Sequence, residues 1–125
     1  MTEPRVDILL VEDDGDLREA MLDTLEDAGY TVFSAPNGQE ALSWLREAEH
    51  LPSLILLDLM MPVMDGWQFR EAQRADPRVS NVPVVVLSAM GSQPAIDATD
   101  YLRKPPKAQP LIALVTRFCG PRAAL

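Results

Sequence analysis

Five residues that could bind a metal ion or a charged substrate group follow short apolar runs that lie far apart in the sequence. They are the pair Glu12-Asp13, then Asp58, Ser88 and Lys104. If the three acids meet in the fold they repel one another, by roughly 4 kcal/mol for a pair of charges about 4 Å apart at an effective dielectric constant of about 20. Such a cluster must be protonated or must bind a cation. Hard carboxylate oxygens beside open water positions suit Mg²⁺, which keeps several waters and needs only one or two carboxylates.

The same residue types suggest what such a site could do. A divalent ion together with the Lys104 ammonium would favour ionised Asp58 and make it available as an oxygen nucleophile. Carboxylates do accept phosphoryl groups and form aspartyl phosphates. The transferred group carries charge on its oxygens, which a metal, Lys104 and the Ser88 hydroxyl could stabilise. The set therefore favours phosphoryl acceptance at Asp58.

Each residue taken alone has a simpler explanation. The acidic stretch 12–16 could be a solvated loop that caps a helix. Asp58 could cap the following turn, Ser88 could be an ordinary hydroxyl at a strand end, and Lys104 is unremarkable before Pro105. The functional interpretation depends on four separate strand ends each supplying a suitable residue type.

The elements that must position these residues alternate along the chain. The hydrophobic pattern predicts strands over 6–11, 31–34, 54–57, 84–87 and 101–103, and helices from about 17 to 28, 37 to 48, 66 to 74 and 110 to 118. The first, third and fourth runs are apolar almost throughout, which is typical of parallel strands covered by helices on both faces. We expect an α/β fold with a doubly wound five-stranded parallel sheet of the flavodoxin-like order 2-1-3-4-5. In that order the first and third strands are neighbours, so Glu12, Asp13 and Asp58 converge.

The connection between the fourth and fifth predicted strands is short. Gly91 and Pro94 lie within it, and both are poor residues for a helix interior. We therefore expect the fourth helix to be shortened, irregular or missing. The stretch 89–99 is predicted to be mobile, and strong protection from amide exchange there would contradict this.

Composition excludes several classes of function. The chain has 125 residues, 47% of them hydrophobic, with a net charge of −8 and a pI near 4.5. We expect one domain over 1–125, with a core at about 5–119 and no output domain. The acidic balance argues against nucleic-acid and anionic-membrane partners. Lone Cys119 and lone His50 indicate neither a disulfide nor a metal cluster, and no secretory signal is visible, so we expect a protein of the reducing cytoplasm.

The sequence resembles the response-regulator receiver family from about Arg5 to Phe118. Four segments carry the resemblance: ILLVEDD at 8–14, LLDLMMPVMDG at 56–66, VVVLSA at 84–89 and DYLRKP at 100–105. The second is highly specific, and its order and spacing with the others make coincidence improbable. This sequence departs from the family pattern at the short 89–103 connection and at Pro106, a position where the family more often has an aromatic residue.

The resemblance implies a role for each candidate residue. Asp58 is expected to be the phosphoacceptor, and Mg²⁺ to be held by Asp13, Asp58 and the Met60 main-chain carbonyl, with Glu12 acting through water. Ser88 and Lys104 are expected to contact the phosphoryl group, and Ser88 with Tyr101 to form the switch. Further expectations are that Asp14 lies outside the metal site, that Asp65-Gly66 is the turn opening the third helix, and that the Lys104–Pro105 bond is cis. Met60 and Met90 flank the route of the hydrolytic water in the family, which predicts a long-lived phosphoryl group.

Two kinds of function remain open at this stage. The first is a response regulator that receives its phosphoryl group from a sensor histidine kinase or a histidine phosphotransfer protein and signals through phosphorylation-dependent protein contacts. The second is a degenerate receiver that binds partners independently of phosphate. A phosphatase of the haloacid-dehalogenase type is disfavoured because Met60 stands where a second acid is needed, and the chain has no glycine-rich nucleotide loop. We expect no enzymatic activity beyond slow self-dephosphorylation.

Overall fold

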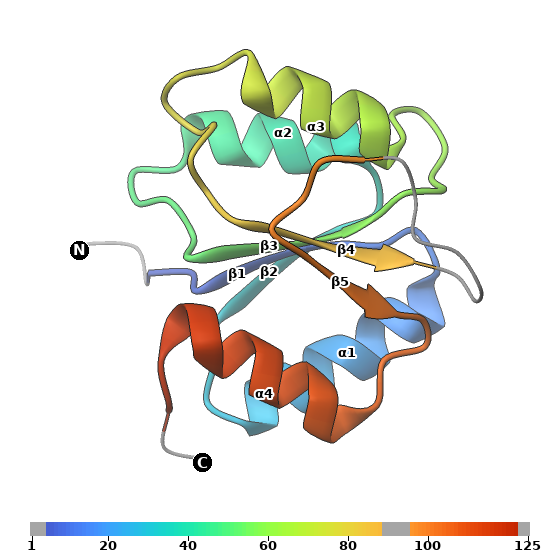
Figure 1. The fold of residues 1–125 in the computed structure, drawn as a ribbon, viewed down its shortest axis with the longest axis vertical. Helices are drawn as coiled ribbons and strands as arrows, with labels where there is room; N and C mark the ends of the chain where they lie inside the picture. Colours follow the sequence, from blue (N-terminus) through green and yellow to red (C-terminus); the bar gives the residue numbers. More distant parts are fainter. Residues whose placement is uncertain (1–4, 89–95, 123–125) are drawn as a thin grey trace.

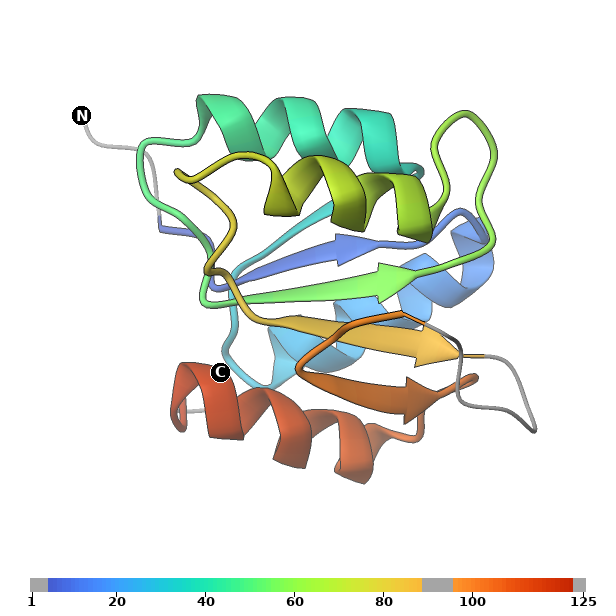
Figure 2. The same ribbon diagram turned by 45° about the horizontal axis from the view of Figure 1, so that its top comes forward.

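The computed structural model describes residues 5–88 and 96–122. Five strands form one parallel sheet in the order β2-β1-β3-β4-β5, as predicted (Figures 1 and 2). The strands are β1 (Ile8–Val11), β2 (Val32–Ala35), β3 (Leu54–Asp58), β4 (Val84–Ser88) and β5 (Asp100–Arg103), and the helices are α1 (Gly15–Asp27), α2 (Gly38–Glu47), α3 (Gly66–Arg74) and α4 (Ala108–Cys119). The predicted fold class is confirmed.

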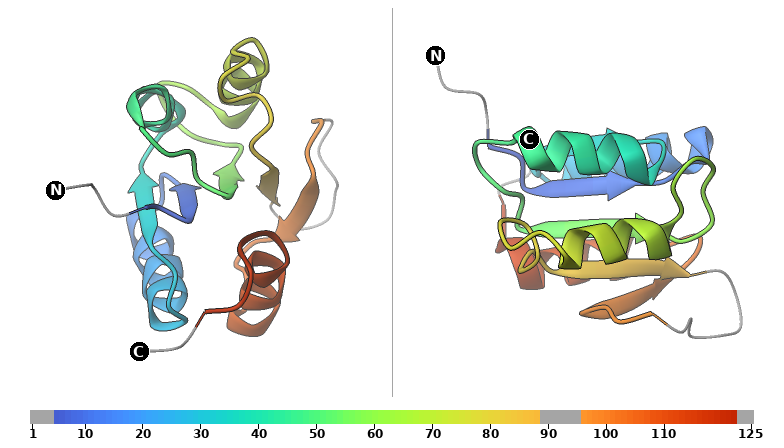
Figure 3. Two further views of the ribbon diagram at one scale, coloured as in Figure 1. Left: turned by 90° about the vertical axis from the view of Figure 1, so that its left-hand side faces the viewer. Right: turned by 90° about the horizontal axis from the view of Figure 1, so that it is seen from above.

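Helices cover both faces of the sheet. Helices α2 and α3 form one layer, and α1 and α4 form the other (Figure 3). Alternate residues of the central strands serve the two layers: Leu9, Ile55 and Val84 pack toward α2 and α3, while Ile8 and Leu54 pack toward α1 and α4. Burial on both sides explains why β1, β3 and β4 are apolar without alternation. Among the described residues, no helix is long and apolar enough to cross a membrane.

Short polar side chains cap the N-termini of three helices. The Asp14 carboxylate accepts from the backbone N–H groups of Asp16 and Leu17 at the start of α1. Asn37 caps α2 through the N–H of Glu40. Asp65 forms a reciprocal capping box with Gln68 at the start of α3. These bonds satisfy amide groups that have no partner within the helix.

Several predicted boundaries were wrong. Strand β1 begins at Ile8, not at residue 6, because the Asp7 carboxylate accepts from the Thr31 N–H at a bend. Strand β2 is displaced by one residue to Val32–Ala35. Helix α1 begins earlier than expected, directly after Asp14. Helix α4 also begins earlier, at Ala108, since Pro110 falls in its first turn, where a missing N–H costs no intrahelical bond.

The connection between β4 and β5 departs from the pattern of the other crossovers. Residues 96–99 form no helix in the structure. The Thr99 N–H donates to the Val84 carbonyl at 2.8 Å, which ties the end of this segment to the start of β4. Residues 89–95, including Met90, Gly91 and Pro94, lie outside the described residues, and the expected mobility of 89–99 therefore stays a prediction.

Candidate functional site

The strand register brings the candidate residues to one edge of the sheet. Val11 pairs with Leu57, so Glu12 follows β1 at the level where Asp58 ends β3. Asp58 itself pairs with Leu87 of β4, and Ser88 is the next residue along that strand. All five strands run in parallel, so their carboxyl ends lie on the same side of the molecule (Figure 2). Ligands of open α/β sheets bind at this edge.

Lys104 connects the tips of β1, β3 and β5. Its Nζ lies 3.0 Å from Glu12 Oε1 and 3.2 Å from Asp58 Oδ1. Its backbone N–H donates to the Ser88 carbonyl at 2.8 Å, which fixes the residue beside β4. The Lys104–Pro105 peptide bond is cis, as expected. The ammonium is thus held between two carboxylates that are distant in sequence.

Three carboxylates converge in a mostly buried cluster. Oxygens of Glu12, Asp13 and Asp58 all lie within 4.8 Å of one another. Glu12 is 0% exposed and Asp58 only 3%, whereas Asp13 lies at the surface. Asp58 Oδ2 is buried and accepts no hydrogen bond from any described residue. A buried anionic oxygen with no donor, beside an accessible carboxylate, fits a hard divalent cation.

The crowding raises the pKa of Asp58 from its ordinary value of 3.8 to about 7. Burial is the main cause, followed by the hydrogen-bond interaction with Asp13 and the charge of Glu12, while the Lys104 ammonium acts in the opposite direction. The pKa of Lys104 is raised: burial opposes its charge, but the hydrogen bond to Glu12 and the charge of Asp58 outweigh it. Additional positive charge is therefore needed to keep Asp58 ionised at neutral pH.

A tight loop after Asp58 supports the site. The Met60 N–H lies 3.4 Å from Asp58 Oδ1, and the Met60 side chain is 73% exposed. Gly66 donates to the Leu59 carbonyl at 2.9 Å, and a Cβ atom at Gly66 would lie 2.7 Å from the Asp58 carbonyl oxygen and Leu59 Cα. Only glycine permits this approach, so the Asp65-Gly66 turn places α3 directly against the end of β3.

The two switch candidates occupy different positions. Ser88 is half-buried next to Asp58 by register. Tyr101 is half-buried against the core under α2 and α3, and its hydroxyl donates to the Ile96 carbonyl. The structure thus brings Glu12, Asp13, Asp58, Ser88 and Lys104 together, and it connects Tyr101 to the segment before β5.

Two supporting residues had no recognisable signal in the sequence. Arg18 Nη1 donates to the Glu12 carbonyl at 2.8 Å and ties α1 to the acidic loop. Gly38 donates to the Met64 carbonyl at 3.1 Å, and a Cβ at Gly38 would meet Met64 at 2.9 Å. Asp14, by contrast, serves as the helix cap and lies outside the carboxylate cluster.

Comparison with known proteins agrees with this fold. The model of the response regulator receiver domain matches residues 8–116. The chain therefore belongs to the receiver-domain family of response regulators. Its structural neighbours are CheY-like receivers.

Three similar proteins illustrate the range of the family. Response regulator Rre1 of Synechocystis sp. is 44% identical over 92 residues, and the match covers 73% of this chain but 38% of Rre1. The chemotaxis response regulator CheY4 of Vibrio cholerae is 31% identical, with a TM-score of 0.80 over 92% of this chain and 99% of that one. The receiver domain of the sensor histidine kinase PA1611 of Pseudomonas aeruginosa is 28% identical, with a TM-score of 0.83 over 94% of this chain and 99% of that one. Its structure has a magnesium ion in the active-site cleft.

Proposed function

We propose that the chain accepts a phosphoryl group on Asp58 from a phosphohistidine of a sensor histidine kinase or a histidine phosphotransfer protein. The observation that carries this proposal is a buried carboxylate, 3.2 Å from a lysine ammonium, within a cluster of three acids. That arrangement holds a nucleophilic oxygen next to the positive charge that the transferred group requires. Membership of the receiver family agrees with it.

The residues present fit a magnesium ion. Asp13, Asp58 and the Met60 main-chain carbonyl would hold it, with Glu12 acting through a water molecule. When bound, Mg²⁺ supplies charge that offsets the acids and the phosphoryl oxygens. The fit rests on Asp58 Oδ2, which has no hydrogen-bond partner within 5–88 and 96–122, and on the accessible Asp13.

In the proposed reaction an ionised Asp58 oxygen attacks the phosphorus atom of the donor. The bond from phosphorus to the histidine nitrogen breaks, and its electron pair returns to the imidazole. Lys104 would exchange its contact with Asp58 Oδ1 for an oxygen of the new phosphoryl group. The Ser88 hydroxyl would donate to another phosphoryl oxygen.

Signalling would follow from these new contacts. Ser88 and Lys104 are drawn toward the phosphoryl group, and Tyr101 moves into the space that Ser88 leaves. A full change from 1:99 to 99:1 between two states takes about 5.5 kcal/mol of differential stabilisation. Partner proteins would then distinguish the two states by the surface around β5. If Tyr101→Ala leaves partner binding equally dependent on phosphate, this relay is wrong.

Incubation with acetyl phosphate and Mg²⁺, followed by intact mass measurement, tests the proposal without a cognate kinase. Wild type should gain one phosphoryl group, and Asp58→Asn should gain none. Asp14→Asn is the matched control, because it changes an acid of the same loop outside the cluster. Absence of the gain in wild type would overturn the proposal and favour a binding module independent of phosphate. Location in the cytoplasm stays a prediction.

A further inference from the structure

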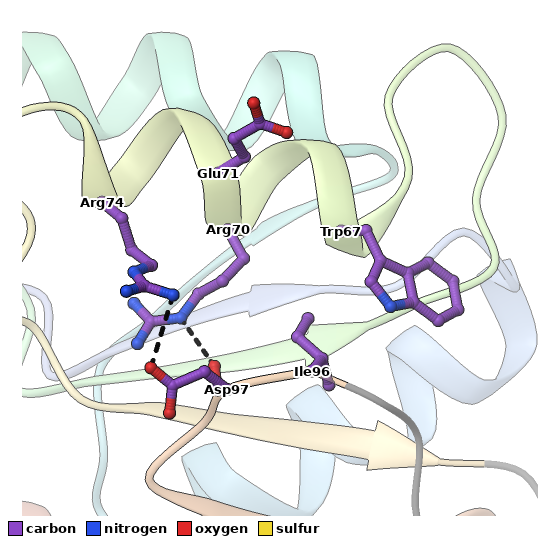
Figure 4. Close-up of a pocket in the computed structure, with 6 residues that line it drawn as sticks. All are labelled: Trp67, Arg70, Glu71, Arg74, Ile96 and Asp97. Carbon is purple, nitrogen blue, oxygen red and sulfur yellow. Dashed lines mark hydrogen bonds and ion pairs between the residues drawn. The ribbon is translucent and has the colours of Figure 1, made fainter.

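The segment before β5 is held by side chains from two sides. Tyr101 of β5 donates its hydroxyl to the Ile96 carbonyl. Arg70 of α3 donates Nε to the next carbonyl, that of Asp97, at 2.9 Å. Arg74, one turn further along α3, places Nη1 3.4 Å from Asp97 Oδ2. Figure 4 shows both arginines extending from α3 toward Asp97, beside a cavity of about 280 Å³ that Trp67 and Ile96 also line. We call the contacts of Arg70 and Arg74 with Asp97 the arginine clasp.

Arg70 is fixed by more than the clasp. Its Nη1 donates to Gln73 Oε1 at 2.8 Å. Gln73 is fully buried, and its Nε2 donates to the carbonyls of Val79 and Val82 at 3.1 Å. The guanidinium is therefore oriented by the protein interior before it meets Asp97, so little conformational freedom is lost in making that bond.

The two carbonyls that accept these bonds belong to consecutive peptide groups. Because peptide groups are planar, only the two backbone dihedral angles of Asp97 lie between these carbonyls, so a displacement of the Ile96 carbonyl is expected to shift the Asp97 carbonyl as well. If Tyr101 moves and releases Ile96, the Arg70–Asp97 bond is strained or lost. The converse also holds, since a coupling between two contacts acts equally in both directions.

The clasp coexists with a direct contact between the Lys104 ammonium and Asp58. In the same structure Lys104 bridges Glu12 and Asp58, at 3.0 and 3.2 Å. A phosphoryl group on Asp58 would compete for that ammonium. Uptake of a phosphoryl group would therefore oppose this arrangement, of which the clasp and the Tyr101–Ile96 bond are part.

We propose that Arg70 is a positioning residue for the switch, because the arginine clasp holds residues 96 and 97 where the Ile96 carbonyl accepts from the Tyr101 hydroxyl. The proposal rests on the proposed function of Asp58. In this chain the short connection between β4 and β5 is anchored to α3 by two guanidinium groups. Loosening that anchor shifts the equilibrium toward the phosphorylated arrangement.

Calorimetry tests this inference by measuring the affinity for beryllium trifluoride, a phosphoryl mimic, in saturating Mg²⁺. Arg70→Gln should lower the stability of the protein yet bind the mimic roughly two- to tenfold more tightly, the range that one hydrogen bond supplies. General damage to the fold would weaken binding instead. Arg74→Gln should have the same sign and a smaller effect, since Arg74 makes only a 3.4 Å ion pair between exposed side chains, whereas Arg70 makes a 2.9 Å hydrogen bond to the main chain.

Arg78→Gln is the matched control. Arg78 also donates to main-chain carbonyls, those of Leu45 and Arg46 at 2.9 and 3.0 Å, but it lies away from the 96–97 segment. It should destabilise the protein without changing the affinity for the mimic. In a Tyr101→Phe background, which lacks the hydroxyl, the effect of Arg70→Gln should fall by at least half.

The outcomes separate the two hypotheses. If wild type does not bind the mimic and takes up no phosphoryl group, the proposed function fails. If wild type binds the mimic but Arg70→Gln binds it equally or less tightly, or if Arg78→Gln tightens it as much, the positioning role is overturned. An undiminished effect in Tyr101→Phe would also overturn the relay through Ile96.

Discussion

At the scale of single residues, Asp58 combines deep burial with a surplus of negative charge. Its neighbours Glu12 and Asp13 disfavour a third negative charge in the cluster, and Lys104 offsets only part of this. Free energy that destabilises the ionised acid is available to a cation that relieves the crowding. The residue that makes the site reactive should therefore also reduce the stability of the metal-free protein.

Asp58→Asn should stabilise the metal-free protein at alkaline pH. The folded-state pKa of Asp58, about 7, lies above its ordinary value of 3.8. Its contribution to stability is therefore present below about pH 4 and is lost as the pH rises through 7. At pH 8 we expect Asp58→Asn to exceed wild type by roughly 1–3 kcal/mol in urea unfolding with chelator present. Near pH 4 the two should be similar; equal stability at pH 8 would show that the carboxylate is not crowded.

Met60 should slow the loss of the phosphoryl group. Its flexible side chain is 73% exposed next to Asp58, where it can cover the approach of water. We expect a phosphoryl lifetime of minutes or longer in Mg²⁺ buffer, followed by intact mass, and a shorter one in Met60→Asn. A half-life of seconds in wild type would refute the prediction. Met90, the other residue considered for this role, lies outside the described residues.

At the scale of elements, the loop from β3 to α3 positions the site through close contacts and one strained residue. Val63 has φ of 70°, and Met64 donates to the Pro62 carbonyl at 2.7 Å, forming a three-residue turn. A positive φ is costly for a β-branched residue. The Val63 side chain is 79% exposed and gains little from packing. The loop is nevertheless held in place by the contact of Gly38 with Met64.

Val63→Gly should stabilise the protein. Relief of the left-handed conformation is worth about 1–3 kcal/mol, against roughly 0.5–1 kcal/mol for the greater freedom of glycine in the unfolded chain. The expected net gain is about 1 kcal/mol in chemical denaturation. Val63→Ala, which keeps a Cβ, should gain less. A loss of stability in the glycine variant would mean that a contact of the valine side chain stabilises the fold by more than the positive φ destabilises it.

The sequence predicted the elements better than their limits. Apolar runs in β1, β3 and β4 are local features, and so they could be recognised in advance. The acidic stretch 12–16 indicated a helix cap without singling out Asp14, and the Asp65-Gly66 turn was implied by the family resemblance. The start of β1 depends on a bond from Thr31 to Asp7, which only the folded chain brings together. The contacts of Lys104 with Glu12 and of Arg70 with Asp97 likewise join distant segments and leave no periodic pattern. Residue types at strand ends therefore predicted the site, whereas its ion pairs and the clasp required the structure.

At the scale of the whole molecule, the layer of α1 and α4 is joined by a polar contact at its edge. The Tyr30 hydroxyl donates to the Gly120 carbonyl at 2.7 Å and lies 3.0 Å from Thr116 Oγ1. Arg122 lies over the Tyr30 ring and forms an ion pair with Asp7 at 2.9 Å. Tyr30 is 4% exposed, so its hydroxyl depends on these partners.

Tyr30→Phe should destabilise the whole domain. Removing the hydroxyl leaves the Gly120 carbonyl without that donor, at a cost of about 1–2 kcal/mol. Thermal unfolding should show a single transition at lower temperature, because one domain unfolds cooperatively. Thr116→Val should cost less, since the Gly120 bond remains. An unchanged transition in Tyr30→Phe would indicate that the α4 end is not coupled to the core.

Calorimetric titration with Mg²⁺ tests most directly whether acids from separate strand tips share one cation site. Near neutral pH wild type should bind a single ion and release protons, because the raised pKa of Asp58, about 7, leaves part of the population protonated beforehand. Asp13→Asn should abolish or strongly weaken binding, and Asp58→Asn should abolish the proton release. Binding that is unaffected by both substitutions, or no binding in wild type, would contradict a shared site.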